Sequence, residues 1–521
     1  MRLELNVPSS VEPSAAGGDF ASRLFAQDAT LWGPSAEREA GIRLAWTDLS
    51  TSSRPLVDIV AALRTEFQAR GLTHVVLCGM GGSSLAPEVI CAAAGVQLTV
   101  LDSSHPDMVR DVLADRLEES VVVVSSKSGG TVETDSLLRA YVDAFEQSGL
   151  KPADHLVIVT DPGSPFDKDA TSSGYLVIKA DPDVGGRYSA LSAFGLVPSG
   201  LAGADIGALL DSAEAARVAL ASDSPDNPAV RLGAALASAH AAGVDKLVVR
   251  DASGIGLGDW IEQLVAESTG KDGHGILPVV VPTEHAINFS PSAVDGFLVT
   301  TGSTTLPNSS SGYSAAIEAE LGAQFLLWEA AVAVAGAAIG INPFDQPDVE
   351  SAKQAARTFL TAAGTEVTPA DIQAGGISAY DTSATTLEAA VEDLLAQLDP
   401  DHGYVAIQAY LDRLALPAYA ELRELVAERT ERPVTFGWGP RFLHSTGQLH
   451  KGGPATGVFL QLTDDPAQDL DVPGRDFTFG QFIAAQAAGD AQVLEAHGRP
   501  LLRLHLTDAS SALPRLRELL A

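Results

Sequence analysis

The chain has 521 residues, of which 46% are hydrophobic and 19% are charged. This length favours two or more domains, and the composition is that of a folded globular protein, which excludes a disordered chain. Lys and Arg total 33 against 67 for Asp and Glu, so the net charge is −34, which argues against nucleic acid or an anionic membrane surface as a partner.

Residues 1–45 are punctuated by Gly, Ser and Pro, and we expect them to form an N-terminal arm. The first subdomain is predicted over residues 46–205, and a second subdomain with a C-terminal extension over residues 206–521. The first residues lack a basic segment followed by an apolar run, and Cys78 and Cys91 are the only cysteines. Both features favour a cytoplasmic protein.

Short apolar runs alternate with helix-like segments in the first subdomain, which predicts parallel strands joined by helices. The predicted strands are 74–79, 97–102, 121–126 and 155–161. After an Ala-rich helical segment near 206–243, a second series of strands is predicted at 246–251, 276–282, 297–302, 404–410, 433–439 and 457–462. The expected fold is α/β, with two subdomains that each contain a mainly parallel sheet flanked by helices in three αβα layers.

Two segments interrupt this rhythm. The apolar stretch 326–341 is shorter than the ~20 residues that a bilayer requires and contains Glu329, so we expect a buried core helix and no membrane span. Between about 363 and 386, Gly, Ser and Thr become frequent and the apolar periodicity fades, which indicates a surface loop or insertion.

A glycine-rich turn follows the strand at 74–79 and contains Gly81, Gly82 and Ser83. Backbone N–H groups at a turn from strand to helix can bind an anion, with help from the helix dipole. A dinucleotide-binding turn is the alternative, because Asp102 ends the next strand where a ribose-binding acid would lie. Ser84 at the position of the third glycine weakens that alternative, and a tight turn without any ligand stays open.

A second loop of the same design follows the strand at 121–126. Its hydroxyl groups belong to Ser126, Ser128, Thr131 and Thr134, and Lys127 supplies a positive charge. These groups can donate hydrogen bonds to phosphate oxygens, although Ser and Thr at the start of a helix can also cap it. Two such loops on one edge of a parallel sheet predict a pocket for a monophosphate.

Five motifs together resemble the sugar isomerase fold and, within it, the glucose-6-phosphate isomerase family. They are GMGGSSLAP (79–87), SKSGGTVET (126–134), GGRYSALSAFGLVP (185–198), AESTGKDGHGILP (266–278) and INPFDQPDVESAK (341–353). The family's histidine-bearing segment is not found between the last two motifs. Instead, RFLHSTGQLHKGGP (441–454) follows them, which is similar to the isomerase half of fused transaldolase/glucose-6-phosphate isomerase chains.

The resemblance implies that Glu267 is the catalytic base, which moves a proton between adjacent carbons. Glu262, five positions earlier, falls on a different helix face and is expected to be solvated. Arg187 follows two glycines and would stabilise the negative charge of an enediolate, with a structural ion pair as the alternative.

Opening the sugar ring requires a group that protonates the ring oxygen and one that deprotonates the anomeric hydroxyl. The resemblance gives the first role to Lys353, with a hydrogen bond from Gln346 nearby. His444 is preferred for the second role, because 444–453 aligns with the family's histidine segment with one residue missing. His450 is the alternative, as a further group that contacts substrate.

The implied reaction is the interconversion of glucose 6-phosphate and fructose 6-phosphate through a cis-enediol, in glycolysis and gluconeogenesis. A hexose 6-phosphate is the expected partner, and neither a cofactor nor a metal is required. Two alternatives are an isomerase that also accepts mannose 6-phosphate and a sugar-phosphate sensor without catalysis. The oligomeric state is left open, with a homodimer as one candidate.

Overall fold

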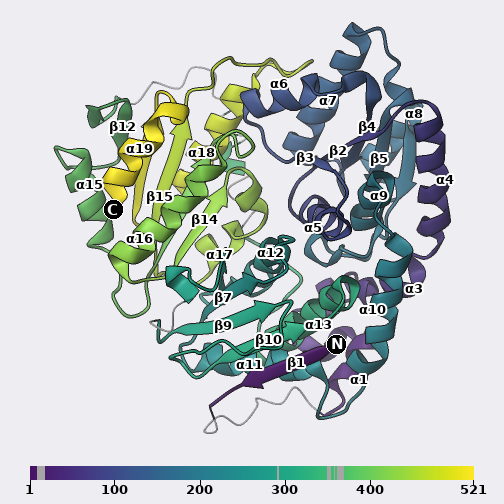
Figure 1. Ribbon diagram of the computed structural model, residues 1–521, viewed down its shortest axis with the longest axis horizontal. Helices are drawn as coiled ribbons and strands as arrows, with labels where there is room; N and C mark the ends of the chain where they lie inside the picture. The colour runs from purple at the N-terminus through teal and green to yellow at the C-terminus, as the bar shows by residue number, and fades with distance from the viewer. Residues whose placement is uncertain (9–17, 290–292, 349–353, 357, 359, 361–368) are drawn as a thin grey trace.

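The first sheet lies in the N-terminal half of the chain and is parallel throughout. The computed structural model describes residues 1–8, 18–289, 293–348, 354–356, 358, 360 and 369–521, and within these ranges the strands form three sheets (Figure 1). The order of the first sheet is β3-β2-β4-β5-β6. Its strands are β2 (His74–Gly79), β3 (Thr99–Leu101), β4 (Ser120–Ser125), β5 (Leu156–Thr160) and β6 (Leu176–Lys179).

The second sheet has the order β1-β10-β9-β7-β8. Its strands are β1 (Arg2–Asn6), β7 (Lys246–Asp251), β8 (Leu277–Val281), β9 (Gly296–Thr301) and β10 (Ser314–Glu318). β1 pairs antiparallel with β10, whereas the other pairs are parallel. The first residues of the chain therefore complete the edge of a sheet whose other strands lie far along the sequence, from Lys246 onward.

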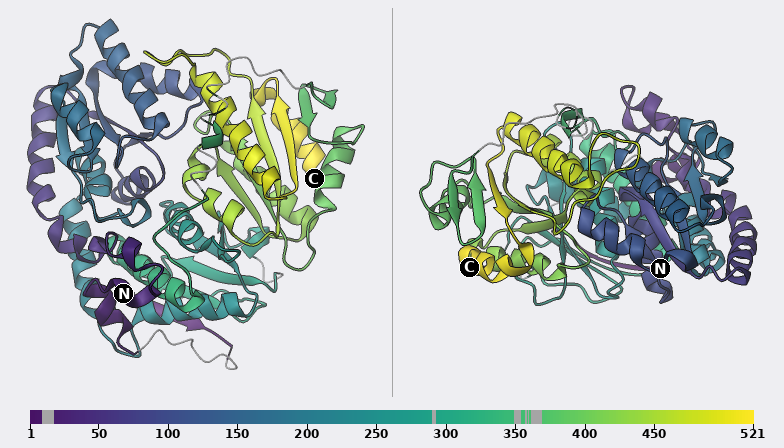
Figure 2. Two further views of the ribbon diagram at one scale, coloured as in Figure 1. Left: turned by 180° about the vertical axis from the view of Figure 1, so that it is seen from behind. Right: turned by 90° about the horizontal axis from the view of Figure 1, so that it is seen from above.

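The third sheet has the order β11-β12-β16-β15-β13-β14. Its strands are β11 (Ile372–Ala374), β12 (Ile377–Tyr380), β13 (Tyr404–Tyr410), β14 (Val434–Trp438), β15 (Gly457–Asp464) and β16 (Leu501–Leu506). The last four are parallel, and β11 and β12 extend them as an antiparallel edge. In Figure 1 the third sheet lies at the left, the first at the upper right and the second below, and Figure 2 shows the same lobes from behind and from above.

The helices connect and cover these sheets. Those of the first half are α1 (Phe20–Phe25), α2 (Glu37–Ala40), α3 (Leu49–Ser52), α4 (Pro55–Ala69), α5 (Leu85–Ala94), α6 (Pro106–Ala114), α7 (Val132–Gln147), α8 (Pro165–Ser172), α9 (Ala193–Ala202) and α10 (Ile206–Leu220). Those of the second half are α11 (Pro228–Ala241), α12 (Leu257–Thr269), α13 (Leu321–Ile339), α15 (Leu387–Leu395), α16 (Leu422–Thr430), α17 (Gly447–Gly452), α18 (Phe479–Ala496) and α19 (Ala509–Leu520).

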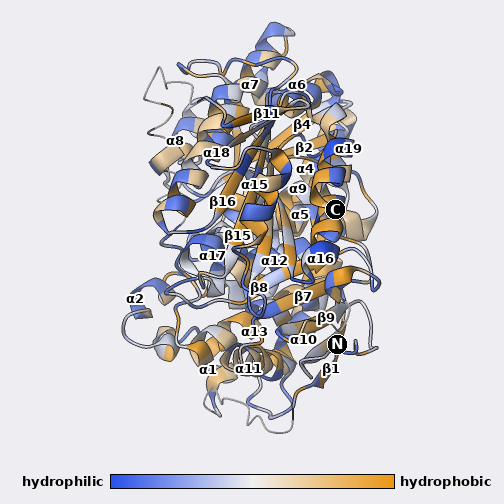
Figure 3. Ribbon diagram, turned by 90° about the vertical axis from the view of Figure 1, so that its left-hand side faces the viewer, coloured by the Kyte–Doolittle hydropathy of each residue, from blue (hydrophilic) through white to orange (hydrophobic). Residues whose placement is uncertain are grey.

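Burial on both faces explains why the strands of the first sheet are continuous apolar runs. Val75, Leu77 and Val123 belong to the cluster that includes α4 and α9, while Val76 and Val124 belong to the cluster that includes α6 and α7. Successive side chains of a strand point to opposite faces, so a sheet covered by helices on both sides needs apolar residues at every position. Figure 3 shows hydrophobic residues along the central strands.

α13 is a core helix, as the sequence predicts. Among the described helices it is the one long and apolar enough to cross a membrane, but most of it is buried, and it packs against α10, α11 and α12. Glu329 lies fully inside, and burial raises the pKa of its carboxyl well above the ordinary value. Burial thus favours the neutral form of this carboxyl, which reduces the cost of placing it in the core.

The fold class and the predicted strands are confirmed, and the arrangement of the second series differs from the expectation in one respect. Strands expected as one series over 246–462 divide between the second and third sheets, and the division falls within the stretch 318–372, which contains α13. Six described strands were missed, namely β1, β6, β10, β11, β12 and β16. β16 lies between β12 and β15, and the sequences of β12 and β16 carry polar residues that break the apolar run. The domain boundaries at residues 45 and 205 stay predictions.

Candidate active site

A pocket of about 160 Å³ lies at the carboxyl ends of the first sheet and brings together most of the predicted site residues. Its lining residues are Met80, Gly81, Gly82, Ser83, Ser125, Ser126, Lys127, Thr131, Thr134, Gly186, Arg187, Gln263, Glu267, Gln346 and His444. The loops after β2 and β4 form one wall, α12 supplies the acid, and the turn after β14 supplies the histidine. All three parts of the fold therefore contribute to one pocket.

The glycines of the first loop are required by close packing. Gly81 has φ +57°, and a Cβ atom there would lie 2.8 Å from the carbonyl oxygen of His444. A Cβ atom at Gly82 would lie 2.0 Å from the carbonyl oxygen of Gly186. Any side chain at these positions would push the loop away from the two segments that carry His444 and Arg187.

The structure does not support the dinucleotide alternative. Asp102 is fully buried, and Ser84 Oγ donates a hydrogen bond of 3.3 Å to its Oδ2 atom. Arg413 Nε and Arg441 Nη1 also donate to its two oxygens, at 3.0 Å and 2.7 Å. Its carboxylate is thus occupied by protein groups and has no access to a ribose.

The second loop turns into α7 and keeps most of its hydroxyl groups in the pocket. Ser126 Oγ accepts a 3.2 Å hydrogen bond from the backbone of Gly129, which fixes the turn. Thr131 is the N-cap of α7, but its side chain makes no capping hydrogen bond. Ser128 does not line the pocket; it is exposed and accepts from the backbone of Gly130. Ser128 is therefore not among the predicted groups that this pocket brings together.

Two buried hydroxyls in the pocket have no hydrogen-bond partner in the described part of the chain, Ser125 Oγ and Thr134 Oγ1. A buried polar group without a partner costs free energy, so this arrangement suits a ligand that supplies acceptor oxygens. Lys127 adds charge, although its Nζ also forms a 2.7 Å ion pair with Asp161. Sequence reasoning missed Ser125, and its position at the end of β4, directly before the loop, was the available signal.

Arg187 is held rigidly at the opposite wall, and only 3% of its side chain is exposed. Its Nε donates to Ser268 Oγ at 2.9 Å, its Nη1 to Gln346 Oε1 at 2.9 Å and its Nη2 to the carbonyl of Pro343 at 2.6 Å. Nη1 also lies 3.4 Å from Glu267 Oε1. A guanidinium fixed in this way can stabilise negative charge that develops beside the carboxylate.

Glu267 lies near the end of α12 inside the pocket, with 12% of its side chain exposed. Gln263, one turn earlier, donates 3.2 Å to Glu267 Oε2 and 2.8 Å to the carbonyl of His444, so one amide positions both groups. Glu262 lies on another face, as predicted, but the expectation that it is solvated is wrong. It is partly buried in a different pocket, and burial, followed by the nearby charge of Asp259, raises its pKa to about 8.

His444 lies in a short 3₁₀ turn, Arg441–His444, and pairs with a carboxylate that the sequence reasoning missed. Its Nε2 is 3.1 Å from Glu133 Oε1, and the two side chains are 13% and 9% exposed. Gln486 on α18 donates 2.7 Å to the same oxygen. A carboxylate orients the imidazole ring of a histidine, so this pair can take part in proton transfer. Glu133 lies within the 126–134 motif, which was the available signal.

The structure separates His450 from the pocket. It lies on α17, is 2% exposed, and its Nδ1 is 2.9 Å from the hydroxyl of Tyr404, with the two rings stacked. Burial lowers the pKa of its imidazole to about 3. We therefore withdraw its assignment as a substrate-binding group. Lys353 lies outside the described residues. Among those described, no group of three or more His, Cys, Asp or Glu side chains is arranged to hold a metal ion.

Two arginines form ion pairs that link the turn carrying His444 to the first sheet. Arg441 and Arg413, from the third sheet's connections, bind Glu88 of α5 and Asp102 at the end of β3. Burial would raise the pKa of Glu88, but the two guanidinium groups overcome it and lower the pKa to about 2. Since Arg441 lies three residues before His444, this cluster fixes the histidine across the interface between the sheets.

Residues 58–273 match the family model for phosphoglucose isomerase. A glucose-6-phosphate isomerase from Rippkaea orientalis is 30% identical over 354 residues, which is 56% of this chain and 67% of that protein. Another, from Thermosynechococcus vestitus, is 38% identical over 224 residues, which is 39% of this chain and 41% of that protein.

Two solved structures resemble the fold. A hypothetical protein from Thermus thermophilus has a TM-score of 0.58 at 25% identity, and the match covers 70% of this chain and 100% of that one. A glucose-6-phosphate isomerase from Chlamydia trachomatis has a TM-score of 0.53 at 22% identity, covering 66% and 77%, which supports the fold alone.

A fixed carboxylate beside a fixed guanidinium, opposite unpartnered hydroxyls at the end of β4 and the start of α7, defines an enzyme of the sugar-phosphate isomerase class. The motifs, the family model and the curated relatives agree with this assignment. The chain belongs to the glucose-6-phosphate isomerase family.

Proposed function

We propose that this pocket interconverts glucose 6-phosphate and fructose 6-phosphate, with Glu267 as the group that moves the proton. The observation that carries the proposal is the 3.4 Å pair between Arg187 Nη1 and Glu267 Oε1, in a pocket whose other wall presents unpartnered hydroxyls. This geometry supports a substrate whose phosphate lies at the loops and whose reacting carbons lie beside the carboxylate.

The phosphate end of the substrate would lie between the two loops. Ser125 and Thr134 offer free hydroxyls, and the first turn of α7 offers backbone N–H groups. Local positive potential is needed here because the whole protein is strongly acidic, and Lys127 and Arg187 supply it.

Ring opening comes first, because the substrate is mostly a closed ring. His444, held by Glu133, would carry one of the protons that this step requires. The second acid–base group is expected to be Lys353, on the motif resemblance alone.

Glu267 would then remove the proton from C2 of the open-chain sugar and return it to C1. The electron pair of the broken C2–H bond forms a C1=C2 double bond, and the π pair of the C1 carbonyl moves to its oxygen, which gives an enediolate whose charge Arg187 stabilises. A proton passes from the C2 hydroxyl to the C1 oxygen, so that the C2 carbonyl forms when C1 is protonated. A single carboxylate performs both transfers because the two carbons are adjacent and lie on the same side of the cis-enediol.

Glu267→Gln tests the proposal, since it removes the base and retains its shape. We expect turnover of glucose 6-phosphate to fall about 10²- to 10⁴-fold, the usual contribution of a general base. Exchange of the C2 proton with solvent deuterium, followed by NMR, should fall in parallel. Glu66→Gln, an exposed change of the same kind on α4, is the control and should leave both rates unchanged. Unchanged exchange in Glu267→Gln would discard the assignment.

The cellular setting is part of the proposal. We infer a cytoplasmic enzyme of glycolysis and gluconeogenesis, which the two buried, unpaired cysteines Cys78 and Cys91 support. Mannose 6-phosphate and a homodimer stay candidates, to be tested by assay with the epimer and by light scattering.

A further inference from the structure

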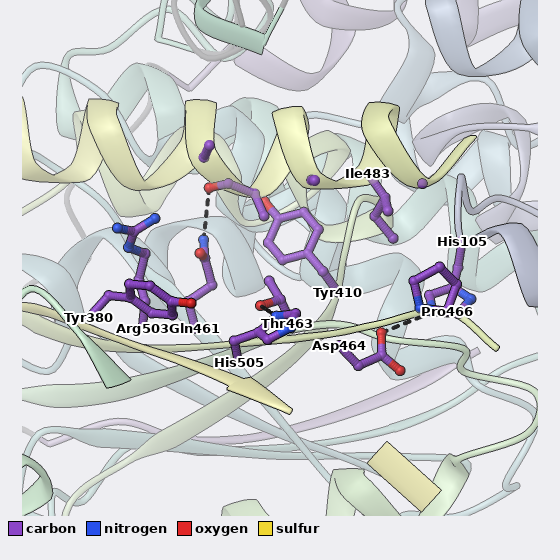
Figure 4. Close-up of a pocket in the computed structure, with 14 residues that line it drawn as sticks. His105, Tyr380, Tyr410, Gln461, Thr463, Asp464, Pro466, Ile483, Arg503 and His505 are labelled. Carbon is purple, nitrogen blue, oxygen red and sulfur yellow. Dashed lines mark hydrogen bonds and ion pairs between the residues drawn. The ribbon is translucent and has the colours of Figure 1, made fainter. Parts of the chain in front are cut away.

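A second pocket, of about 210 Å³, lies between α18 and the carboxyl ends of β13, β15 and β16 (Figure 4). It shares no lining residue with the candidate active site. In this sheet β14 lies on one side of β13, and the next strands along the chain, β15 and β16, lie on its other side. The pocket thus lies beside the switch point of a parallel sheet, which is where such sheets hold ligands.

The face of the third sheet under α18 changes from apolar to polar at this point. Phe459 and Leu501 are followed on the same face by Gln461, Thr463 and His505. Large apolar side chains normally fill the space between a helix and a sheet. Here the polar residues face a helix wall of small residues, namely Gly480, Ala484, Ala487 and Ala488. Small residues opposite polar ones leave an unfilled space between the helix and the sheet, which is typical of a ligand pocket and not of a packed core.

Arg503 and the two histidines of this pocket each have a carboxylate beside them. Arg503 pairs with Asp381, and its guanidinium lies over the ring of Tyr380 at 5.4 Å. His505 Nδ1 is 3.0 Å from Thr463 Oγ1, and its Nε2 is 3.3 Å from Asp465. The lining therefore carries no uncompensated positive charge.

The third such pair involves a buried histidine. His105 Nε2 lies 3.0 Å from Asp464 Oδ1, as Figure 4 shows by a dashed line. His105 is 2% exposed, and its Nδ1 has no hydrogen-bond partner among the described residues. A buried ring nitrogen without a partner at the edge of a pocket is accounted for by a ligand that supplies one.

We propose that this pocket binds an uncharged, polyhydroxylated ring compound of the size of one pyranose. Hydroxyl groups both donate and accept, which matches the amide oxygen of Gln461, the hydroxyl of Thr463 and the imidazole of His105. The amide nitrogen of Gln461 donates 3.0 Å to the carbonyl of Ala487, which fixes the direction of the amide. The C–H face of such a ring would pack on Tyr380 and the alanines of α18. A phosphorylated sugar is disfavoured, because Arg503, the one arginine or lysine among the lining residues, is already paired with Asp381, and Asp464 adds a carboxylate to the lining.

The same helix reaches the ring-opening pair. Gln486, next to Ala487, donates its hydrogen bond to Glu133, the partner of His444. Tyr410, which lines the pocket, packs edge-on against Phe442 in the turn that carries His444, with ring centroids 5.5 Å apart. A bound ligand that orders α18 would therefore change the rate of ring opening. This coupling rests on the proposed function, whereas the binding does not.

Binding is tested without turnover. The active site is first filled with 1,5-anhydroglucitol 6-phosphate, which lacks an anomeric hydroxyl and cannot isomerise. Methyl α-D-glucopyranoside, methyl α-D-mannopyranoside and myo-inositol are then titrated by calorimetry. We expect at least one to bind with a Kd below about 10 mM, an ordinary weak affinity for a small ligand.

Two variants locate the binding. Ala484→Leu fills the pocket from an exposed position of α18, and Thr463→Val removes one hydroxyl with little change in shape. Each should weaken binding at least about 10-fold, the equivalent of 1.4 kcal/mol, while Gln492→Leu, an exposed change on α18 outside the pocket, should not. Thermal melts check that all variants fold. No binding by any compound, equal binding to Ala484→Leu, or preference for the 6-phosphate of the glucoside would overturn the proposal.

The coupling has its own readout. The compound that binds should change turnover of glucose 6-phosphate at least about two-fold in the wild type and in Gln492→Leu, and should have no such effect in Ala484→Leu. Binding without any change in wild-type turnover would overturn the coupling and leave the site. An equal effect in Ala484→Leu would mean that the compound acts at the active site, which also overturns it.

Discussion

The contact between His444 and Glu133 predicts that a mutation of Glu133 slows the reaction of a closed-ring substrate more than that of an open-chain substrate. Their atoms lie 3.1 Å apart, and Glu133 is 9% exposed, so water screens the interaction little. Glu133→Gln keeps the shape and removes the charge. Hydrogen bonds to charged groups contribute about 1.5–3 kcal/mol, and about 1.36 kcal/mol is a factor of ten, so ring opening should slow about 10- to 150-fold.

The assay compares a cyclic and an open-chain substrate. Turnover of glucose 6-phosphate includes ring opening. Erythrose 4-phosphate cannot close a furanose ring, because its C4 oxygen carries the phosphate, so solvent exchange of its C2 proton reports on Glu267 alone. We expect the variant to exchange this proton within about three-fold of the wild-type rate, since the base and Arg187 are untouched.

Equal loss on both substrates would refute the reasoning, because it would show that Glu133 acts on the base or on the fold. A second check uses the double variant with His444→Ala. If the carboxylate acts only through the imidazole, the double variant should be no slower than His444→Ala alone. Additive losses would show that Glu133 acts independently of the imidazole of His444.

Three further changes test the packing and electrostatics. Gly82→Ala should destabilise the protein by about 1–3 kcal/mol through the clash with the neighbouring backbone, which an unchanged melting temperature would contradict. Glu262, with a folded pKa of about 8 against an ordinary 4.5, binds its proton more tightly in the folded state, so the free energy of unfolding should fall as pH rises between these values. Urea titrations at about pH 5 and pH 8 should show that Glu262→Gln removes at least about 1 kcal/mol of this fall; parallel pH profiles would exclude the effect. Arg441→Met leaves the buried Asp102 and the partly exposed Glu88 with Arg413 as their remaining arginine partner and should cost about 1–3 kcal/mol, with glucose 6-phosphate turnover reduced more than erythrose 4-phosphate exchange. An equal reduction of both rates would show that Arg441 does not act by positioning His444.

Local patterns in the sequence predict the first sheet and its loops well. The strand at 74–79 and the glycines after it obey short-range rules, because burial on both faces demands apolar runs and the close approach at Gly82 demands glycine. The placement of Arg187 and Glu267 in one pocket came from motif resemblance, since two residues so far apart in the chain have no local signature.

The sequence does not show which side chains far apart in the chain contact one another. Glu133 and His444 are 311 positions apart, and nothing near either residue indicates the other. His450 has the same local character as His444, but the rings of Tyr404 on β13 and Phe459 on β15 pack against it. The third sheet was likewise missed as a separate unit, because its parallel strands repeat the same pattern as those of the second.

The cluster of Arg413, Arg441, Glu88 and Asp102 has a consequence for partial unfolding. It joins the connections of the third sheet to those of the first, and therefore the histidine to the phosphate loops. If mild acid or heat detaches the third sheet before the rest melts, the remaining parts still hold Glu267 beside Arg187. Such a partly opened enzyme would keep exchanging protons on linear sugars after losing the ability to use rings, so the order in which the two activities disappear would reveal the weakest interface.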